Sequence, residues 1–100
     1  MATKYEAGRQ SEYKVQTELE AEGYCTLRAA GSKGKVDVVA WNETETRFIQ
    51  VKTFLTRQGS YAADIKALDG MVFPTGSTVE LWIRQRGQRG WLHKHVLRRT

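Results

Sequence analysis

Four polar side chains stand inside stretches of this sequence whose pattern otherwise favours burial. Glu12 shares a helical sector with Val15, so its carboxylate is directed at the predicted core. Asp37 interrupts the apolar run VDVVAW, although aspartate is disfavoured in strands. Gln50 and Lys52 alternate with apolar residues in FIQVKT, which places both on one face of a strand. A carboxylate directed at a core, such as that of Glu12, is costly unless a partner compensates it. The other three are polar intrusions into strand patterns, so all four are candidate site residues.

The types of these side chains suit metal-assisted chemistry on a phosphate. Oxygen atoms of Glu12, Asp37 and Gln50 are ligands of the kind that Mg²⁺ or Mn²⁺ prefers. Such a cation polarises a scissile phosphate and lowers the pKa of bound water. Lys52 would orient that water or stabilise charge developing on the phosphate oxygens. An ordinary explanation also exists, because Glu12 can reach water at the rim of its helix, Asp37 can face solvent on an edge strand, and most lysines are exposed.

The elements that must position these residues follow from hydrophobic periodicity. One hundred residues are enough for a single domain with one modest core, here a domain spanning residues 1–100. The expected order is α-β-β-β-α-β-β, which makes a mixed five-stranded sheet flanked by helices, of the α/β or α+β mixed class. The pattern predicts a helix over 7–22 that ends at Gly23, strands over 24–30, 35–41 and 47–54, a helix over 60–72, and a hairpin of strands 79–84 and 91–96.

The charge of the chain favours a polyanionic partner. Its formal net charge is +5, and no acidic residue follows Glu80. Such a basic segment suits a phosphate backbone, although solubility alone can also explain it. The sequence contains neither a signal peptide nor an apolar run long enough to span a membrane, so we expect a cytoplasmic protein (in the host cytoplasm if viral) that does not bind membranes. The single cysteine, Cys25, excludes an internal disulfide, and we expect it to be a buried thiol.

Three segments together resemble the archaeal-type Holliday junction resolvases, nucleases of the PD-(D/E)XK, restriction-endonuclease-like superfamily. They are GRQSE (8–12), LRAAGSKGKVDVVA (27–40) and FIQVK (48–52), and the similarity runs in order over about residues 5–96. The stretch AGSxxxVD with an arginine before it is the specific part. A lone aspartate followed by E/Q-x-K would indicate only the superfamily.

The resemblance implies roles for individual residues. Glu12 and Asp37 match the metal-binding carboxylates of the family, and Lys52 matches its catalytic lysine. Arg28 and Ser32 match an arginine and a serine that act in DNA handling and catalysis beside the metal, so Ser32 is also a candidate catalytic residue. The family acts as a homodimer, needs Mg²⁺ and no small-molecule cofactor, and makes paired nicks in a four-way DNA junction. Symmetric cutting of two strands explains why two copies are needed. Near such a site, the basic residues expected to contact the DNA backbone are Arg9, Lys33, Lys35 and Arg57.

Two positions depart from the family pattern. The family usually has arginine after the helix glutamate, where this chain has Tyr13, and Arg9 is a candidate replacement. It also has glutamate in the E-x-K motif, where this chain has Gln50, so the metal shell loses one negative charge. Two alternatives therefore stay open. One is an Mrr-like or nicking nuclease on duplex or branched DNA, since Q-x-K occurs in such enzymes. The other is a catalytically weak module that binds junctions.

Overall fold

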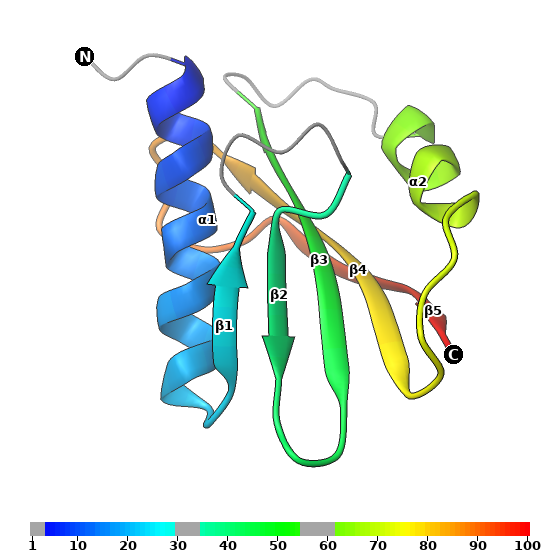
Figure 1. The fold of residues 1–100 in the computed structure, drawn as a ribbon. Helices are drawn as coiled ribbons and strands as arrows, with labels where there is room; N and C mark the ends of the chain where they lie inside the picture. Colours follow the sequence, from blue (N-terminus) through cyan, green and yellow to red (C-terminus); the bar gives the residue numbers. More distant parts are fainter. Residues whose placement is uncertain (1–3, 30–34, 55–61) are drawn as a thin grey trace.

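A computed structural model describes residues 4–29, 35–54 and 62–100, without the side chains of residues 4 and 5. Its elements follow the predicted order and confirm the α+β class with a mixed five-stranded sheet (Figure 1). No helix in these ranges is long and apolar enough to cross a membrane. The helices are α1 (Lys4–Ala21) and α2 (Ala62–Asp69), and the strands are β1 (Cys25–Arg28), β2 (Val38–Trp41), β3 (Thr46–Phe54), β4 (Ser77–Gln85) and β5 (His93–Arg99).

The strands lie in the sheet in their chain order, β1-β2-β3-β4-β5. The β3–β4 pair is parallel and the other three pairs are antiparallel. A parallel pair needs a crossover connection, and α2 lies within that connection. Short turns suffice for the antiparallel pairs, as in the β4–β5 hairpin, where Gly87 has a φ of 84°.

Helix α1 buries one continuous stripe against the sheet. Ala7, Ser11, Val15 and Leu19 are all buried, and their spacing of four residues keeps them on one side of the helix. Val15 and Leu19 pack with residues of β2, β3 and β4 in the main core. The helix ends as predicted at Gly23, whose φ of 97° suits glycine. The Gly23 and Tyr24 amides then donate hydrogen bonds back to the carbonyls of the last helical turn.

Helix α2 lies beside β4 and β5 on the opposite face of the sheet (Figure 1). Leu68 is fully buried there, near Val79. β4 is consequently covered on both faces, and Ser77 to Ile83 are all buried. The helix is shorter than the predicted range 60–72 and ends at Asp69. The Arg98 guanidinium of β5 donates hydrogen bonds to the Asp69 and Met71 carbonyls at this end.

Two further expectations at strand ends are corrected by the structure. β5 continues to Arg99, three residues beyond the predicted end at 96, because its ladder with β4 extends to the Thr78–Arg99 pair. Cys25 is exposed and not buried, since it lies at the start of β1, an edge strand.

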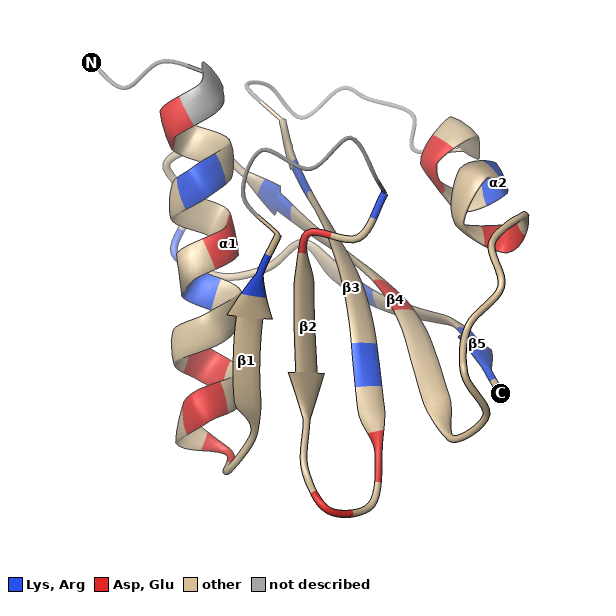
Figure 2. Ribbon diagram, viewed as in Figure 1, with Lys and Arg blue, Asp and Glu red and all other residues tan. Residues whose placement is uncertain are grey.

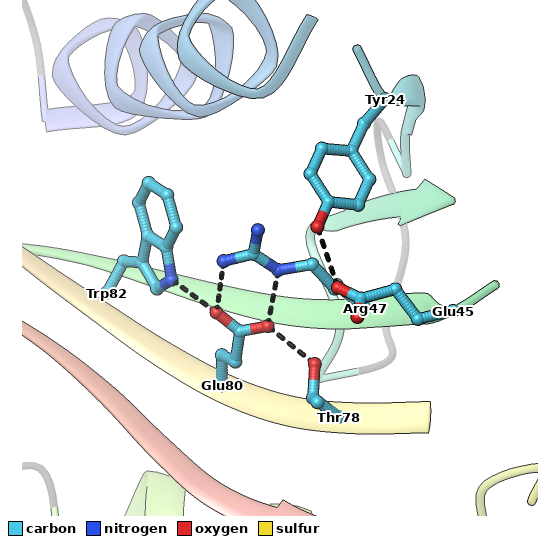
Figure 3. Close-up of polar contacts among 6 residues, drawn as sticks. All are labelled: Tyr24, Glu45, Arg47, Thr78, Glu80 and Trp82. Carbon is cyan, nitrogen blue, oxygen red and sulfur yellow. Dashed lines mark hydrogen bonds and ion pairs between the residues drawn. The ribbon is translucent and has the colours of Figure 1, made fainter. Parts of the chain in front are cut away.

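A polar cluster links the first residues of β3 to β4 (Figure 3). The Arg47 guanidinium donates two hydrogen bonds, of 2.8 and 2.9 Å, to the carboxylate of Glu80, which is only 2% exposed. Thr78 and Trp82 donate to the same carboxylate. Burial raises the pKa of Glu80, but these hydrogen bonds more than offset it and hold the pKa below its ordinary value. The cluster stabilises the sheet at a distance from the residues singled out by sequence.

Candidate active site

The candidate residues gather where β1 ends and β2 begins, beside the N-terminal half of α1. Figure 2 shows charged segments of α1, the tip of β1 and the start of β2 at this one edge of the sheet. Asp37 lies immediately before β2 and not inside the predicted strand over 35–41. Its amide donates to the Ile49 carbonyl at 2.9 Å, and its Oδ2 accepts from the Val51 amide at 2.8 Å. The side chain of Asp37 thus accepts the hydrogen bond of a β3 backbone amide. The regular pairing of β2 with β3 starts only at Val38.

The Asp37 carboxyl group is held in an environment that opposes its charge. Its pKa is raised from 3.8 to about 6, and burial is the largest cause. The negative charges of Glu12 and Asp64 contribute to this rise, whereas the Val51 amide and Lys35 oppose it. The carboxylates of α1 and α2 therefore act electrostatically on the same group. A bound cation would relieve this repulsion.

Glu12 is compensated by an arginine from the neighbouring strand. Its Oε1 accepts a hydrogen bond from Arg28 Nη1 at 2.9 Å, and the side chains of Arg28 and Glu12 are only 17% and 19% exposed. The Arg28 guanidinium also lies over the Tyr13 ring, 4.7 Å from its centroid. Tyr13, the residue that departs from the family pattern, thus supports Arg28 from α1. The adjacent Ser11 fixes this part of the helix.

Ser11 is a positioning residue that sequence reasoning missed. It is fully buried, and its hydroxyl donates to the Ala7 carbonyl within α1. The same oxygen accepts hydrogen bonds from Thr53 of β3 at 2.8 Å and Arg84 of β4 at 3.2 Å. These contacts attach the helix to two strands one residue before Glu12. A serine on a helix gives no sequence signal for such a role, because serines there are common on exposed faces.

Gln50 and Lys52 lie on the same face of β3, as predicted. Asp37 bonds the backbone of the residues on both sides of Gln50, so the two side chains belong to one region. The Oε1 of Gln50 is buried and has no hydrogen-bond partner within the described ranges. Lys52 Nζ is 3.6 Å from Oδ2 of Asp64 in α2. Sequence reasoning missed Asp64, because an acidic residue in the first turn of a helix is ordinary.

The donor set fits a hard divalent cation. Glu12, Asp37 and Gln50 offer only oxygen atoms, which Mg²⁺ and Mn²⁺ prefer. The orphaned amide oxygen of Gln50 is the strongest structural indication, since buried acceptors normally have a partner. No group of three or more acidic, histidine or cysteine side chains able to hold a metal occurs among the described residues. The predicted metal ligands are therefore two carboxylates and an amide.

The other predicted DNA contacts divide into three groups. Arg28 lies in the site, as described above. Lys35 is exposed and close enough to Asp37 to lower its pKa, whereas Arg9 is half-buried on α1, one turn before Glu12 and Tyr13. Ser32, Lys33 and Arg57 lie outside the described residues.

Comparison with known proteins finds a family model and solved structures that match this chain. A family model described as archaeal Holliday junction resolvase (Hjc) matches residues 3–94. The fold is similar to the 1.6 Å structure of Archaeoglobus fulgidus Hjc, a Holliday junction resolvase from an archaeal hyperthermophile, with a TM-score of 0.68. The two sequences are 21% identical, over 90% of this chain and 77% of the other. No curated protein matches the chain.

Proposed function

We propose that this chain is a metal-dependent endonuclease that resolves four-way DNA junctions. The proposal starts from the family, because the chain belongs to the archaeal Holliday junction resolvases. The observation that carries the proposal is the environment of Asp37. The partly buried Asp37 carboxyl group, whose pKa is raised to about 6, contacts the backbone on both sides of Gln50, and the amide oxygen of Gln50 has no partner among the described residues. Perturbed pKa values of this kind are typical of functional sites.

Each residue has a defined part in this proposal. Glu12, Asp37 and Gln50 would hold Mg²⁺ or Mn²⁺. The cation would polarise the scissile phosphate and activate a water for attack. Lys52 would donate hydrogen bonds to the phosphate oxygens as negative charge develops on them. Arg28 pairs with Glu12 in the free protein, and a phosphate could take its guanidinium once a cation binds Glu12.

The cleavage assay uses a synthetic four-way junction with Mg²⁺ or Mn²⁺. We expect paired symmetric nicks that disappear in Asp37→Ala and in Lys52→Ala. Cleavage that both variants leave unaffected would contradict the proposed site. Linear duplex, flap and Y-shaped DNA are compared in the same assay, because a resolvase should strongly prefer the junction. Equal cleavage of all substrates would favour the Mrr-like or nicking nuclease instead.

A homodimer is the form in which such an enzyme can cut two strands symmetrically. An apolar groove of about 400 Å³, lined by Val39, Phe48 and the segment 71–74, offers a surface for the second copy. Val72, one of the residues that line the groove, is 97% exposed. Leu27, which pairs with Val39 on the same face of the sheet, is 61% exposed. A patch of this kind marks a protein contact surface more often than a solvated one.

The dimer is tested with Val72→Glu and with Leu92→Glu as a matched control at another exposed apolar position. Light scattering after size-exclusion chromatography should show a dimer for the control and a monomer for Val72→Glu. The Val72 variant should also lose paired cutting. An unchanged dimer in Val72→Glu would place the interface elsewhere.

A junction-binding module with little catalysis is the second candidate, and the neutral Gln50 favours it. Binding would then persist in EDTA and no metal would restore cleavage. The Gln50→Glu variant separates this candidate from the first. If the missing charge limits catalysis, the variant should cleave faster or at a lower metal concentration. If the module has lost catalysis for another reason, the variant should remain inactive.

A further inference from the structure

We propose that Asp64 is a positioning residue for Lys52 and supplies to this site the negative charge that Gln50 does not provide. This inference rests on the proposed nuclease function and assigns a part in it to helix α2. The observations that carry it are the Lys52–Asp64 ion pair and the composition of β3.

The ion pair joins α2 to the catalytic face of β3. Asp64 Oδ2 lies 3.6 Å from Lys52 Nζ, and the side chains of Lys52 and Asp64 are 37% and 15% exposed. Lys52 pairs with Ile83 in the parallel β3–β4 ladder, and α2 covers this same face of the sheet. The carboxylate of Asp64 is the more enclosed partner, so the helix presents it to the lysine and not to bulk water.

The sequence of β3 explains why the acid must come from elsewhere. The strand reads TRFIQVKTF and contains no acidic residue. A glutamate at position 50 would lie two residues from Lys52 on the same face, and would be both a metal ligand and a neighbour of the ammonium group. Gln50 retains the oxygen but lacks the charge. Asp64 faces the same ammonium group from α2.

The influence of Asp64 extends beyond Lys52. Its charge, with that of Glu12, contributes to the raised pKa of Asp37, after the larger effect of burial. A carboxylate close enough to disfavour the charge of Asp37 also attracts a divalent cation bound by Asp37. Asp64 therefore connects the lysine and the proposed metal position.

Orientation of the ammonium group is the physical reason that the pair should affect cleavage. A lysine carries its charge on a flexible four-carbon chain with many rotamers. The ion pair restricts the side chain before DNA arrives, so less ordering remains for the transition state. The ordinary explanation is an ion pair that merely contributes to stability, and a partly exposed pair contributes little.

The experiment compares Asp64→Asn with Asp64→Glu and with the control Asp69→Asn, an exposed position on the same helix. Junction cleavage at saturating protein, junction affinity in EDTA, and Mn²⁺ affinity of the protein without DNA are measured for each. We expect Asp64→Asn to lower the cleavage rate about 10- to 100-fold with junction affinity unchanged. Its Mn²⁺ affinity should fall roughly 3- to 10-fold. Asp64→Glu should recover much of both losses, and Asp69→Asn should match the wild type.

A double-variant comparison tests the compensation directly. If Asp64 supplies the charge missing at Gln50, then Asp64→Asn should cost less in the Gln50→Glu background than in the wild type. An equal cost in both backgrounds contradicts the compensation. The proposal is overturned if Asp64→Asn matches Asp69→Asn in cleavage rate and Mn²⁺ affinity, or if Asp64→Asn cleaves faster than the wild type. Cleavage by the wild type in the same experiment would show that the nuclease function still holds. If the wild type does not cleave, the nuclease proposal fails, and Mn²⁺ affinity alone decides whether Asp64 contributes charge.

Discussion

Replacement of Asp37 by asparagine should make the protein more stable while abolishing the proposed metal binding. The variant keeps the shape of the side chain and an oxygen able to accept the Val51 amide. It removes a charge that burial and two neighbouring carboxylates oppose. Stability and function therefore should change in opposite directions at this position.

The magnitude follows from the pKa of Asp37, which is raised from 3.8 to about 6, mainly by burial. At about 1.4 kcal/mol per unit, this difference corresponds to an upper limit of about 3 kcal/mol. The side chain is only partly buried, so we expect about 1–2 kcal/mol, or a Tm higher by roughly 5–15 °C. Between about pH 4 and pH 6 the native state binds more protons than the unfolded state. As the pH rises through this interval, the wild type should therefore lose stability relative to the variant. The full difference in stability should persist above pH 7.

The assay is thermal and urea denaturation from pH 3.5 to pH 8 in EDTA, with Asp69→Asn as the matched control. As the pH falls towards 3.5, the stabilities of the wild type and Asp37→Asn should converge, because the carboxyl group becomes protonated in both the native and the unfolded state. Addition of Mg²⁺ should stabilise the wild type through binding to the native state and leave Asp37→Asn unchanged. A variant that is less stable than the wild type at pH 7.5, with the same pH dependence, would refute the reasoning.

Two further predictions concern stability away from the site. Glu80→Gln should lower the free energy of unfolding by about 3–5 kcal/mol, measured by urea denaturation at pH 7, because the partly buried Arg47 loses its charged partner. Since the pKa of Glu80 lies below its ordinary value of 4.5, this stabilisation should be present at neutral pH and be lost as the pH falls through the native pKa. An unchanged unfolding curve would contradict it. Gly23→Ala should cost about 1 kcal/mol in thermal denaturation, because Gly23 has a positive φ. Gly8→Ala, inside α1, is the control and should stabilise.

The fold was predictable because its signals are local and repeated. Alternation in FIQVKT and the apolar, β-prone run VELWIR indicate strands. Gly23 marks a helix end with a specific backbone requirement. The end of α2 at Asp69 was missed, although Gly70 follows it directly and glycine often ends a helix. The hydrogen bond from Arg98 to the Asp69 carbonyl comes from a residue distant in sequence and gives no local signal. The extent of β5 likewise depends on its pairing with β4. Contacts between distant segments leave no periodic signal in either segment.

The site was predictable where a polar residue broke an apolar pattern. Glu12, Asp37 and Lys52 were identified in this way, and the structure brings them to one edge of the sheet. Ser11 and Asp64 break no pattern, so only the packing of α1 and α2 against the sheet reveals them. The partner of Glu12 was equally hidden, because an ion pair with Arg28 depends on the placement of β1 beside α1.

The charges of the assembled site indicate how metal and DNA should depend on one another. Glu12, Asp37 and Asp64 carry negative charge at neutral pH, while Arg28 and Lys52 neutralise two of these three groups. The remaining negative charge attracts a divalent cation only weakly, and the neutral Gln50 adds an oxygen without adding charge. A DNA phosphate supplies both further oxygen ligands and further negative charge, and it can also take Arg28 away from Glu12. The cation and the junction should therefore strengthen each other's binding by the same factor, since coupling between two ligands is reciprocal. The substrate itself would then complete the proposed metal site, which lacks one negative charge because residue 50 is a glutamine.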